Sequence, residues 1–123
     1  MNAVKFLRIN SDKYNIDPDR IGILGASAGG NLASMVALTD SFDDLGYPEV
    51  SSKVKVLVDM YGPVDMLTHK DYKNLFGYTR AENPEIYKKY SPLNYVDKNS
   101  PPTLLIHSNN DPTVNPTQSE RFY

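Results

Sequence analysis

Gly25-Ala26-Ser27-Ala28-Gly29 is the stretch of this chain that decides the fold. A short apolar run, Ile21-Gly22-Ile23-Leu24, precedes it, and apolar side chains at helical spacing follow over residues 31–38. The run is typical of a strand that is buried on both faces, so the serine lies at a strand-to-helix turn. In that context the pattern G-x-S-x-G predicts a serine nucleophile whose hydroxyl stands clear of the sheet.

The neighbours of Ser27 have separate predicted roles. A sharp turn crowds the serine backbone, so we expect Gly25 and Gly29 to be required because side chains would clash there. The backbone N–H of Ala28 opens the following helix and is expected to point at a developing oxyanion. The alternative is a glycine-rich turn that binds a phosphate or only reverses the chain.

The composition is that of one small globular domain. The chain has 123 residues, of which 40% are hydrophobic and 23% charged, and its net charge is −2. This charge, without a basic cluster, argues against nucleic acid or an anionic membrane as a partner. The absence of cysteine excludes disulfides and thiolate catalysis. With no membrane-spanning run and no signal peptide in the sequence, we expect a cytoplasmic protein.

Strands and helices are predicted to alternate along the chain. The expected elements are strands 21–26, 53–60 and 103–108, helices 2–14 and 28–39, helical turns near 66–75 and 82–90 within the long connection 61–102, and a last helix beginning near Pro116. Alternation of this kind indicates βαβ units and a parallel sheet. If the strands lie side by side in chain order, right-handed crossovers all fall on one face and leave the opposite face bare.

A serine nucleophile needs a base and a carboxylate that orients the base. The preferred carboxylate is Asp111, in the loop just past the third strand, where the active sites of open α/β sheets assemble. Its alternative role is an Asx-turn before Pro112. Asp59 and Asp65, at and beyond the end of the second strand, are competing candidates, and Asp65 could simply cap a helix.

No histidine follows Asp111 in the sequence, and the two that precede it are His69 and His107. We expect His107, at the end of the third strand, to pack or hydrogen-bond in the floor of the site. We expect His69 to be a solvated loop residue among Thr68, Lys70 and Asp71. Two isolated histidines with scattered carboxylates do not predict a metal site.

Aromatic side chains crowd the long connection. They could form the wall or lid of a pocket for an aromatic acyl group or a sugar, or they could be ordinary packing of an irregular segment. The residues are Tyr61, Tyr72, Phe76, Tyr78, Tyr87, Tyr90 and Tyr95.

These motifs together resemble the central part of an α/β-hydrolase esterase, in particular the bacterial feruloyl and acetyl-xylan esterase-like group, related to the lipase/esterase and dienelactone-hydrolase groups. The resemblance covers nearly the whole chain. It rests on Asp17-Pro18-Asp19-Arg20-Ile21-Gly22 leading into Gly25-Ala26-Ser27-Ala28-Gly29-Gly30-Asn31-Leu32-Ala33, on Tyr61-Gly62-Pro63-Val64-Asp65, on Asn83-Pro84-Glu85, on Ser91-Pro92-Leu93-Asn94-Tyr95-Val96, on residues 101–108, on Asp111-Pro112 with Val114, and on Gln118-Ser119-Glu120. Ser108 stands where the group usually has glycine.

The resemblance implies hydrolysis of small-molecule or carbohydrate-linked carboxylic esters without a cofactor. It implies Ser27 as nucleophile, Asp111 as triad acid and the Ala28 N–H as an oxyanion donor. The group's early strands with a His-Gly-Gly loop and its later catalytic histidine have no counterpart in the sequence. We therefore expect residues 1–123 to be a single incomplete α/β-hydrolase domain, running from nucleophile elbow to acid loop, with three parallel strands and about four helices mostly on one face.

Two other functions stay open at the level of the sequence. A fragment of a serine peptidase of the prolyl-oligopeptidase type would share the order of nucleophile, acid and histidine. A non-catalytic remnant or interaction module would use the bare sheet face and open strand edges for self-association or for binding a complementing fragment.

Overall fold

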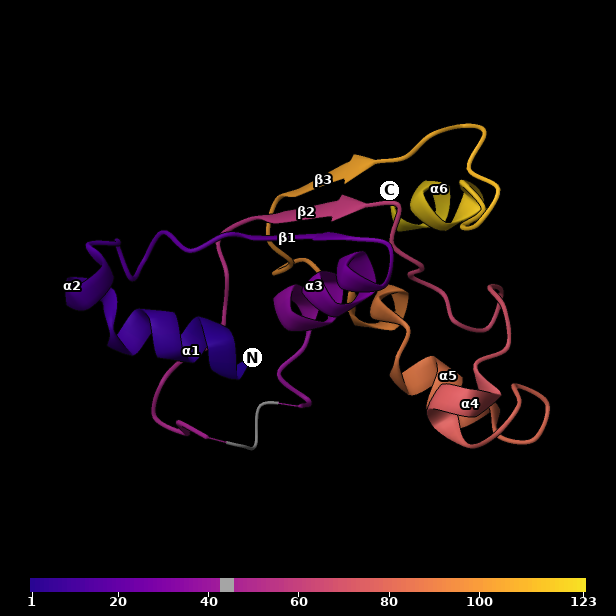
Figure 1. Ribbon diagram of the computed structural model, residues 1–123, viewed down its shortest axis with the longest axis horizontal. Coiled ribbons are helices and arrows are strands. Elements are labelled where there is room, and N and C mark those ends of the chain that lie inside the picture. The colour runs from indigo at the N-terminus through magenta and orange to yellow at the C-terminus, as the bar shows by residue number, and fades with distance from the viewer. Residues whose placement is uncertain (43–45) are drawn as a thin grey trace.

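Three parallel strands form the centre of the computed structural model, which describes residues 1–42 and 46–123 (Figure 1). They are β1 (Ile23–Ala26), β2 (Leu57–Met60) and β3 (Thr103–Ile106), in the order β1-β2-β3. Both neighbouring pairs are parallel, with Ile23 opposite Leu57 and Leu57 opposite Thr103. The predicted α/β class, strand number and chain-order arrangement are therefore confirmed.

Each strand is shorter than the sequence predicted, although the pairing continues beyond the strand ends. Backbone hydrogen bonds join Lys55 N to Ile21 O at 2.8 Å and Ile23 N to Val56 O at 2.9 Å. At the other end, Tyr61 N donates to Ile106 O at 2.8 Å. The apolar runs thus marked the paired segments correctly, and only the outer residues of each run leave regular strand geometry.

Six short α-helices and one 3-10 helix occur among the described residues, more than the four or so predicted. They are α1 (Asn2–Ile9), α2 (Ser11–Tyr14), α3 (Ala28–Leu38), α4 (Lys73–Phe76), α5 (Pro84–Lys89), η1 (Pro92–Tyr95) and α6 (Thr117–Phe122). In the part of the chain that the structure describes, no helix has the length and apolar character needed to cross a bilayer.

The prediction of a single helix over residues 2–14 is wrong, because helical geometry is interrupted at Asn10. Its side-chain amide donates to Phe6 O at 2.8 Å, and its ψ of 24° departs from helical geometry. Asparagine competes for backbone groups in this way and so interrupts helices. Within α1 and α2, Leu7 and Tyr14 are exposed, whereas Val4 is buried.

Arg8 fixes α1 to the segments that lead into β1 and β2. Its guanidinium donates to the carbonyl oxygens of Pro18 and Lys53, each at 2.9 Å, and to that of Ser51. Arginine suits this position, because its guanidinium holds several donors in a rigid fork that can reach three carbonyl oxygens at once. This side chain therefore orders the entry to the sheet.

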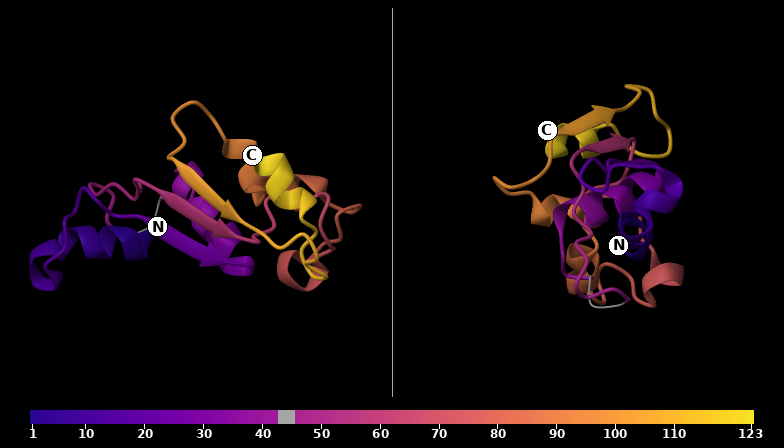
Figure 2. Two further views of the ribbon diagram at one scale, coloured as in Figure 1. Left: turned by 90° about the horizontal axis from the view of Figure 1, so that it is seen from above. Right: turned by 90° about the vertical axis from the view of Figure 1, so that its left-hand side faces the viewer.

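One face of the sheet is covered and the other is bare. In Figure 1 α3 lies below the strands, and the residues buried between them include Ala33, Met35 and Leu57. On the opposite face Leu24 is 63% exposed and Leu104, two strands away in the same register, is 55% exposed. Figure 2 shows the same sheet from above, with no described helix over it. The predicted one-sided covering is confirmed.

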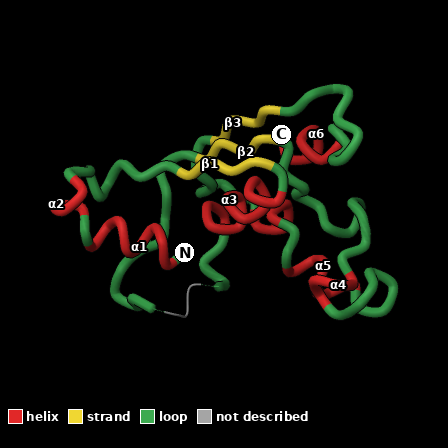
Figure 3. The backbone as a smooth tube through the Cα atoms, in the orientation of Figure 1, coloured by secondary structure: helices red, strands yellow, loops and turns green. Residues whose placement is uncertain are grey.

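The connection between β2 and β3 is mostly loop and turn (Figure 3). Its first helix, α4, begins only at Lys73, because the segment after Asp65 is a turn rather than the predicted start of a helix. The second, α5, begins as predicted behind Asn83, whose side chain accepts from Ile86 N at 3.3 Å. Tyr87 of α5 is fully buried and anchors the whole connection.

Helix α3 approaches the sheet so closely that three glycines lie at the contact. A Cβ on Gly25 would come within 1.9 Å of Gly29 O, and one on Gly30 within 2.5 Å of the Asp59 carboxylate and 2.8 Å of Gly62 Cα. A Cβ on Gly29 would meet nothing within 4 Å among the described residues. The prediction that a side chain would clash is therefore confirmed at Gly25 and wrong at Gly29. A side chain would also clash at Gly30 and Gly62.

We expect Gly30→Ala to lower the free energy of unfolding by about 1–3 kcal/mol, because the methyl group would overlap backbone and carboxylate atoms that cannot move away. Gly29→Ala, one residue earlier in the same helix turn, is the matched control and should stay within about 0.5 kcal/mol of the parent chain. Urea denaturation measures both. Equal losses in the two variants would contradict this account of the helix–sheet contact.

Candidate active site

Ser27 lies at the junction of β1 and α3 in a strained backbone conformation. Its φ is 54° and its ψ is −122°, outside the regions that residues with a Cβ normally adopt. The geometry is held from both sides, because Ser27 N donates to Met60 O at 2.9 Å and Ser27 O accepts from Asn31 N at 3.2 Å. Strain of this kind persists only where the surroundings enforce it, and it is frequent at functional sites.

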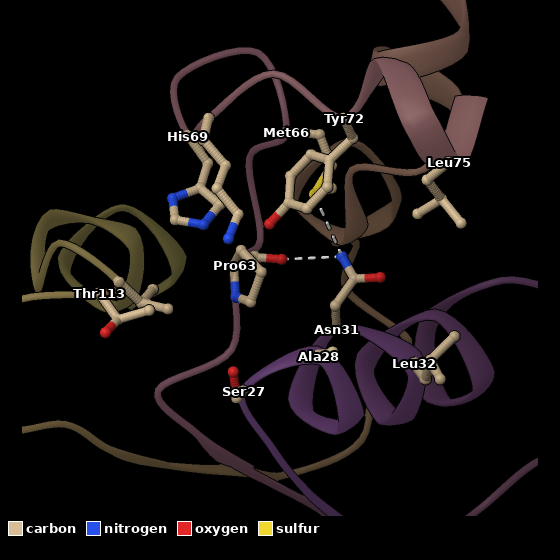
Figure 4. A pocket seen from close by; sticks show the side chains of 12 residues that line it. Ser27, Ala28, Asn31, Leu32, Pro63, Met66, His69, Tyr72, Leu75 and Thr113 are labelled. Carbon is tan, nitrogen blue, oxygen red and sulfur yellow. Dashed lines mark hydrogen bonds between the residues drawn. The ribbon is translucent and has the colours of Figure 1, made fainter. Parts of the chain in front are cut away.

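The hydroxyl of Ser27 points into a cavity of about 330 Å³ (Figure 4). None of the described residues forms a hydrogen bond with it. Ala28 is the first residue of α3, so its backbone N–H has no partner within the helix and lies beside the hydroxyl at the same wall. A hydroxyl that faces a cavity beside the first N–H of a helix is a suitable place for a group that becomes negative.

The cavity brings together segments that are far apart in the sequence. Most of the surface that lines it is apolar, although half of the lining side chains carry a polar group. Its walls are formed by Ser27, Ala28, Asn31, Leu32, Pro63, Met66, His69, Lys70, Tyr72, Leu75, Thr113 and Val114. Because Thr113 and Val114 belong to the loop after β3, the serine turn and the predicted acid loop open at the same end of the sheet.

Asp111 is held firmly within that loop. Its Oδ1 accepts from Thr113 N at 2.8 Å and from Val114 N at 3.0 Å. These hydrogen bonds, that from Val114 first, hold the pKa of the Asp111 carboxyl below its ordinary value. The Asx-turn geometry and the role of acid are compatible, because Oδ2 accepts no hydrogen bond from the described residues and can serve a base.

Asp59, the first competing candidate, faces away from the cavity. It is 1% exposed between the sheet and α3, where its two oxygens accept from Ser34 Oγ at 2.8 Å and from Gly62 N at 2.7 Å. Burial raises the pKa of this carboxyl, and the two hydrogen bonds oppose the rise. Asp59 therefore joins α3 to the loop after β2.

Asp65, the second competing candidate, is also occupied elsewhere. Its carboxylate accepts from Leu67 N at 3.0 Å and pairs with the guanidinium of Arg121 in α6. Gln118 of the same helix accepts from the backbone N–H groups of Val64 and Asp65, at 3.0 and 2.8 Å. The prediction that Asp65 could cap a helix is wrong, because the segment after it is a turn, and the residue instead ties α6 to the segment after β2.

The two histidines occupy different surroundings. His107 has a nearly buried side chain and is hydrogen-bonded, as predicted, to Ser119 Oγ at 2.7 Å and to Val114 O at 2.9 Å, but it does not line the cavity. The prediction of a solvated His69 is wrong, because this side chain is half-buried and lines the cavity across from Ser27. Burial, followed by the charges of Lys70 and Arg80, lowers the pKa of His69.

The aromatic residues divide between the two predicted roles. Tyr72 lines the cavity, with its ring 5.8 Å from that of His69. Phe76 and Tyr90 stack at 5.2 Å, and Phe76 meets Tyr87 edge-on at 4.9 Å, so these three are packing residues. Tyr72 is thus part of the cavity wall, whereas Phe76, Tyr87 and Tyr90 pack together.

The sequence did not single out Asn31 as a site residue. Its amide donates to Pro63 O at 2.8 Å and to Tyr90 O at 3.2 Å, and it lines the cavity one helical turn after Ser27. The spacing of four residues on one helix could have indicated this shared face. Among the described residues, no three histidine, aspartate or glutamate side chains group closely enough to hold a metal ion.

The chain is similar to a known protein family and to several known proteins. The family model BD-FAE matches residues 1–123. Esterase LipQ of Mycobacterium tuberculosis is 30% identical over 131 residues, covering 98% of this chain and 31% of that protein. This chain thus spans about a third of the length of LipQ and of two further mycobacterial relatives.

Two solved structures are also similar. A truncated carbohydrate esterase from gut microbiota superposes with a TM-score of 0.89 at 35% identity, over 97% of this chain and 50% of that one. An acetyl ester-xyloside bifunctional hydrolase from Caldicellulosiruptor lactoaceticus gives a TM-score of 0.83 at 33% identity, over 98% and 46%. The three-stranded sheet and its helices therefore form part of an esterase fold.

The buried carboxyl of Asp59 predicts how stability changes with pH. Because the folded-state pKa of Asp59 lies above the ordinary value of 3.8, the folded state binds the proton more tightly than the unfolded state does. The group therefore contributes stability at low pH, and this contribution is lost as the pH rises through the folded-state pKa. Asp59→Asn cannot ionise, so it should gain stability relative to the parent chain over the pH range above about 4, the ordinary pKa of an aspartate. Urea unfolding across that range measures the difference, and parallel curves for the two proteins would refute it.

Proposed function

Because the chain belongs to the BD-FAE family, we propose that its 123 residues are the elbow-to-acid-loop portion of a single α/β-hydrolase domain in a serine-dependent carboxylic ester hydrolase. The observation that carries the proposal is the strained Ser27, with φ 54° at a strand-to-helix junction, facing a cavity that it shares with the loop of Asp111. The similarity to esterases supports it.

In the proposed reaction the Ser27 oxygen attacks the acyl carbonyl carbon while a base removes the hydroxyl proton. The negative charge that develops on the carbonyl oxygen is stabilised by the Ala28 N–H at the start of α3. The protonated base then gives its proton to the leaving alcohol, which departs and leaves an ester on Ser27. Water, activated by the same base, releases the acid and restores the hydroxyl.

We assign to Asp111 the role of the carboxylate that orients the base, through its Oδ2 atom. The base itself is assigned to a histidine outside these 123 residues, because no histidine follows Asp111 in the sequence and both ring nitrogens of His107 are already engaged. His69 lines the cavity, but no carboxylate among the described residues is hydrogen-bonded to its ring. A base needs such a partner for its tautomer and orientation.

The proposed substrate is a small-molecule or carbohydrate-linked ester. Support comes from the carbohydrate esterase and the acetyl ester-xyloside hydrolase that the chain resembles. The cavity of about 330 Å³ is lined mainly by Leu32, Met66, Leu75 and other apolar groups, which suits an acyl group, and Tyr72 offers a flat ring to a sugar.

We expect the chain by itself to turn over p-nitrophenyl acetate on the order of 10⁶-fold more slowly than a complete triad would, because the base is absent. Added imidazole should restore part of the activity, since it can take the Ser27 proton while Asp111 orients it. Ser27→Ala should abolish the imidazole-dependent rate in excess of that of imidazole alone, and Asp111→Asn should reduce it. Intact-mass spectrometry should find one more acetyl group on the parent chain than on Ser27→Ala.

Ser51→Ala is the matched control, because Ser51 is an exposed serine outside the cavity, and its rate should equal that of the parent chain. An imidazole-dependent rate that is the same with and without the Ser27 hydroxyl would contradict the proposal. A dipeptide amide cleaved faster than the ester would favour a serine peptidase. A chain that stays inactive with imidazole and self-associates in light scattering would favour a non-catalytic module.

A further inference from the structure

The imidazole of His107 joins three separate pieces of the chain. It is the first residue after β3, and its Nε2 lies 2.9 Å from Val114 O, at the far end of the loop that carries Asp111. Its Nδ1 lies 2.7 Å from Ser119 Oγ in α6. The ring therefore closes the acid loop from end to end and fixes it to the following helix. Its side chain is only 7% exposed, so water competes little for these bonds.

The partners determine how the ring is used. A carbonyl oxygen can only accept, so Nε2 carries a proton and donates it to Val114 O. In the neutral ring Nδ1 is then an acceptor, and the Ser119 hydroxyl donates to it. Both nitrogens are committed to holding the loop, which leaves neither of them for removing a proton from Ser27.

The consequence falls on the Asp111 carboxylate. Val114 accepts from His107 through its carbonyl and donates through its N–H to Asp111 Oδ1, so the ring fixes the peptide that orients the carboxylate. Thr113 N donates to the same oxygen. Oδ2 lies 3.6 Å from Nε2, too far for a hydrogen bond from an N–H that already points at Val114 O. One carboxylate oxygen is thereby fixed and the other left available.

We propose that His107 is a positioning residue that sets the loop of Asp111, so that the Oδ1 atom is locked by the loop and the Oδ2 atom is presented to the catalytic base. The inference rests on the proposed function for its catalytic meaning. Its physical content, control of Asp111 by His107 through Val114, can be measured without any turnover.

Other groups face the ring and must be separated from this effect. Asp59 of β2 acts on His107 electrostatically, Tyr61 lies edge-on with its ring centre 6.4 Å away, and Ser119 approaches from α6. The test therefore needs one variant that removes every polar contact of the ring and one that keeps only the donor to Val114 O. His107→Phe is the first and His107→Gln, whose amide can reach the position of Nε2, is the second.

Carboxyl carbon NMR titration of Asp111 in the 123-residue chain is the main measurement. In His107→Phe the Asp111 pKa should rise toward its ordinary value of 3.8, and the Val114 and Thr113 amides should exchange with solvent at least about tenfold faster. His107→Gln should stay close to the parent chain in both respects. A Gln variant that behaves like the Phe variant would overturn the proposal, because charge rather than positioning would then explain the effect, and so would an unchanged titration in both.

A measurement on the parent chain covers the case in which His107→Phe does not fold. Nitrogen-15 NMR of the ring should find the proton of neutral His107 on Nε2, and finding it on Nδ1 would overturn the proposal, because Val114 O would then have no donor. The imidazole-supplemented ester assay separates this proposal from the proposed function. A chain inactive with imidazole refutes the function alone, whereas the Asp111 titration decides the role of His107.

Discussion

The buried carboxylate of Asp59 is the constraint on which the site depends. Burying a carboxyl is unfavourable unless donors replace water, and here Ser34 of α3 and the N–H of Gly62 do so at 2.8 and 2.7 Å. The contact requires glycine at 30, because a Cβ there would lie 2.5 Å from the carboxylate. Helix α3 and the loop after β2 are thus fixed together, and Ser27, which immediately precedes that helix, is held at its positive φ.

The strain at Ser27 is therefore sustained by packing elsewhere. Its N–H is bonded to Met60 O at the end of β2, and Asn31, one turn into α3, is bonded to Pro63 O in the loop that Asp59 holds. These contacts all connect β2, its following loop and the first turns of α3. A backbone conformation that costs about 1–3 kcal/mol persists because this network over-determines it.

The sequence was sufficient for features that local pattern encodes and insufficient for those that depend on contact between distant segments. The apolar runs predicted the three strands, and the pentapeptide around Ser27 predicted the turn, since both signals lie in neighbouring residues. Gly30 could not be separated from Gly29, because only the approach of Asp59 distinguishes them. His69 was misplaced for the same reason, since the fold of the connection after β2, anchored by Tyr87, brings it to the cavity.

The two halves of the site consequently rest on different kinds of contact. The acid loop is nearly self-contained, because Asp111, Val114, His107 and Ser119 bond to one another within one stretch of the chain. The serine turn depends on β2 and its loop, more than thirty residues away, as the 2.9 Å bond to Met60 O shows. Gln118 connects the halves, since it lies one residue before Ser119 and binds the backbone of Val64 and Asp65. The relative position of Ser27 and Asp111, the proposed nucleophile and acid, is therefore set by α6 as well as by the sheet.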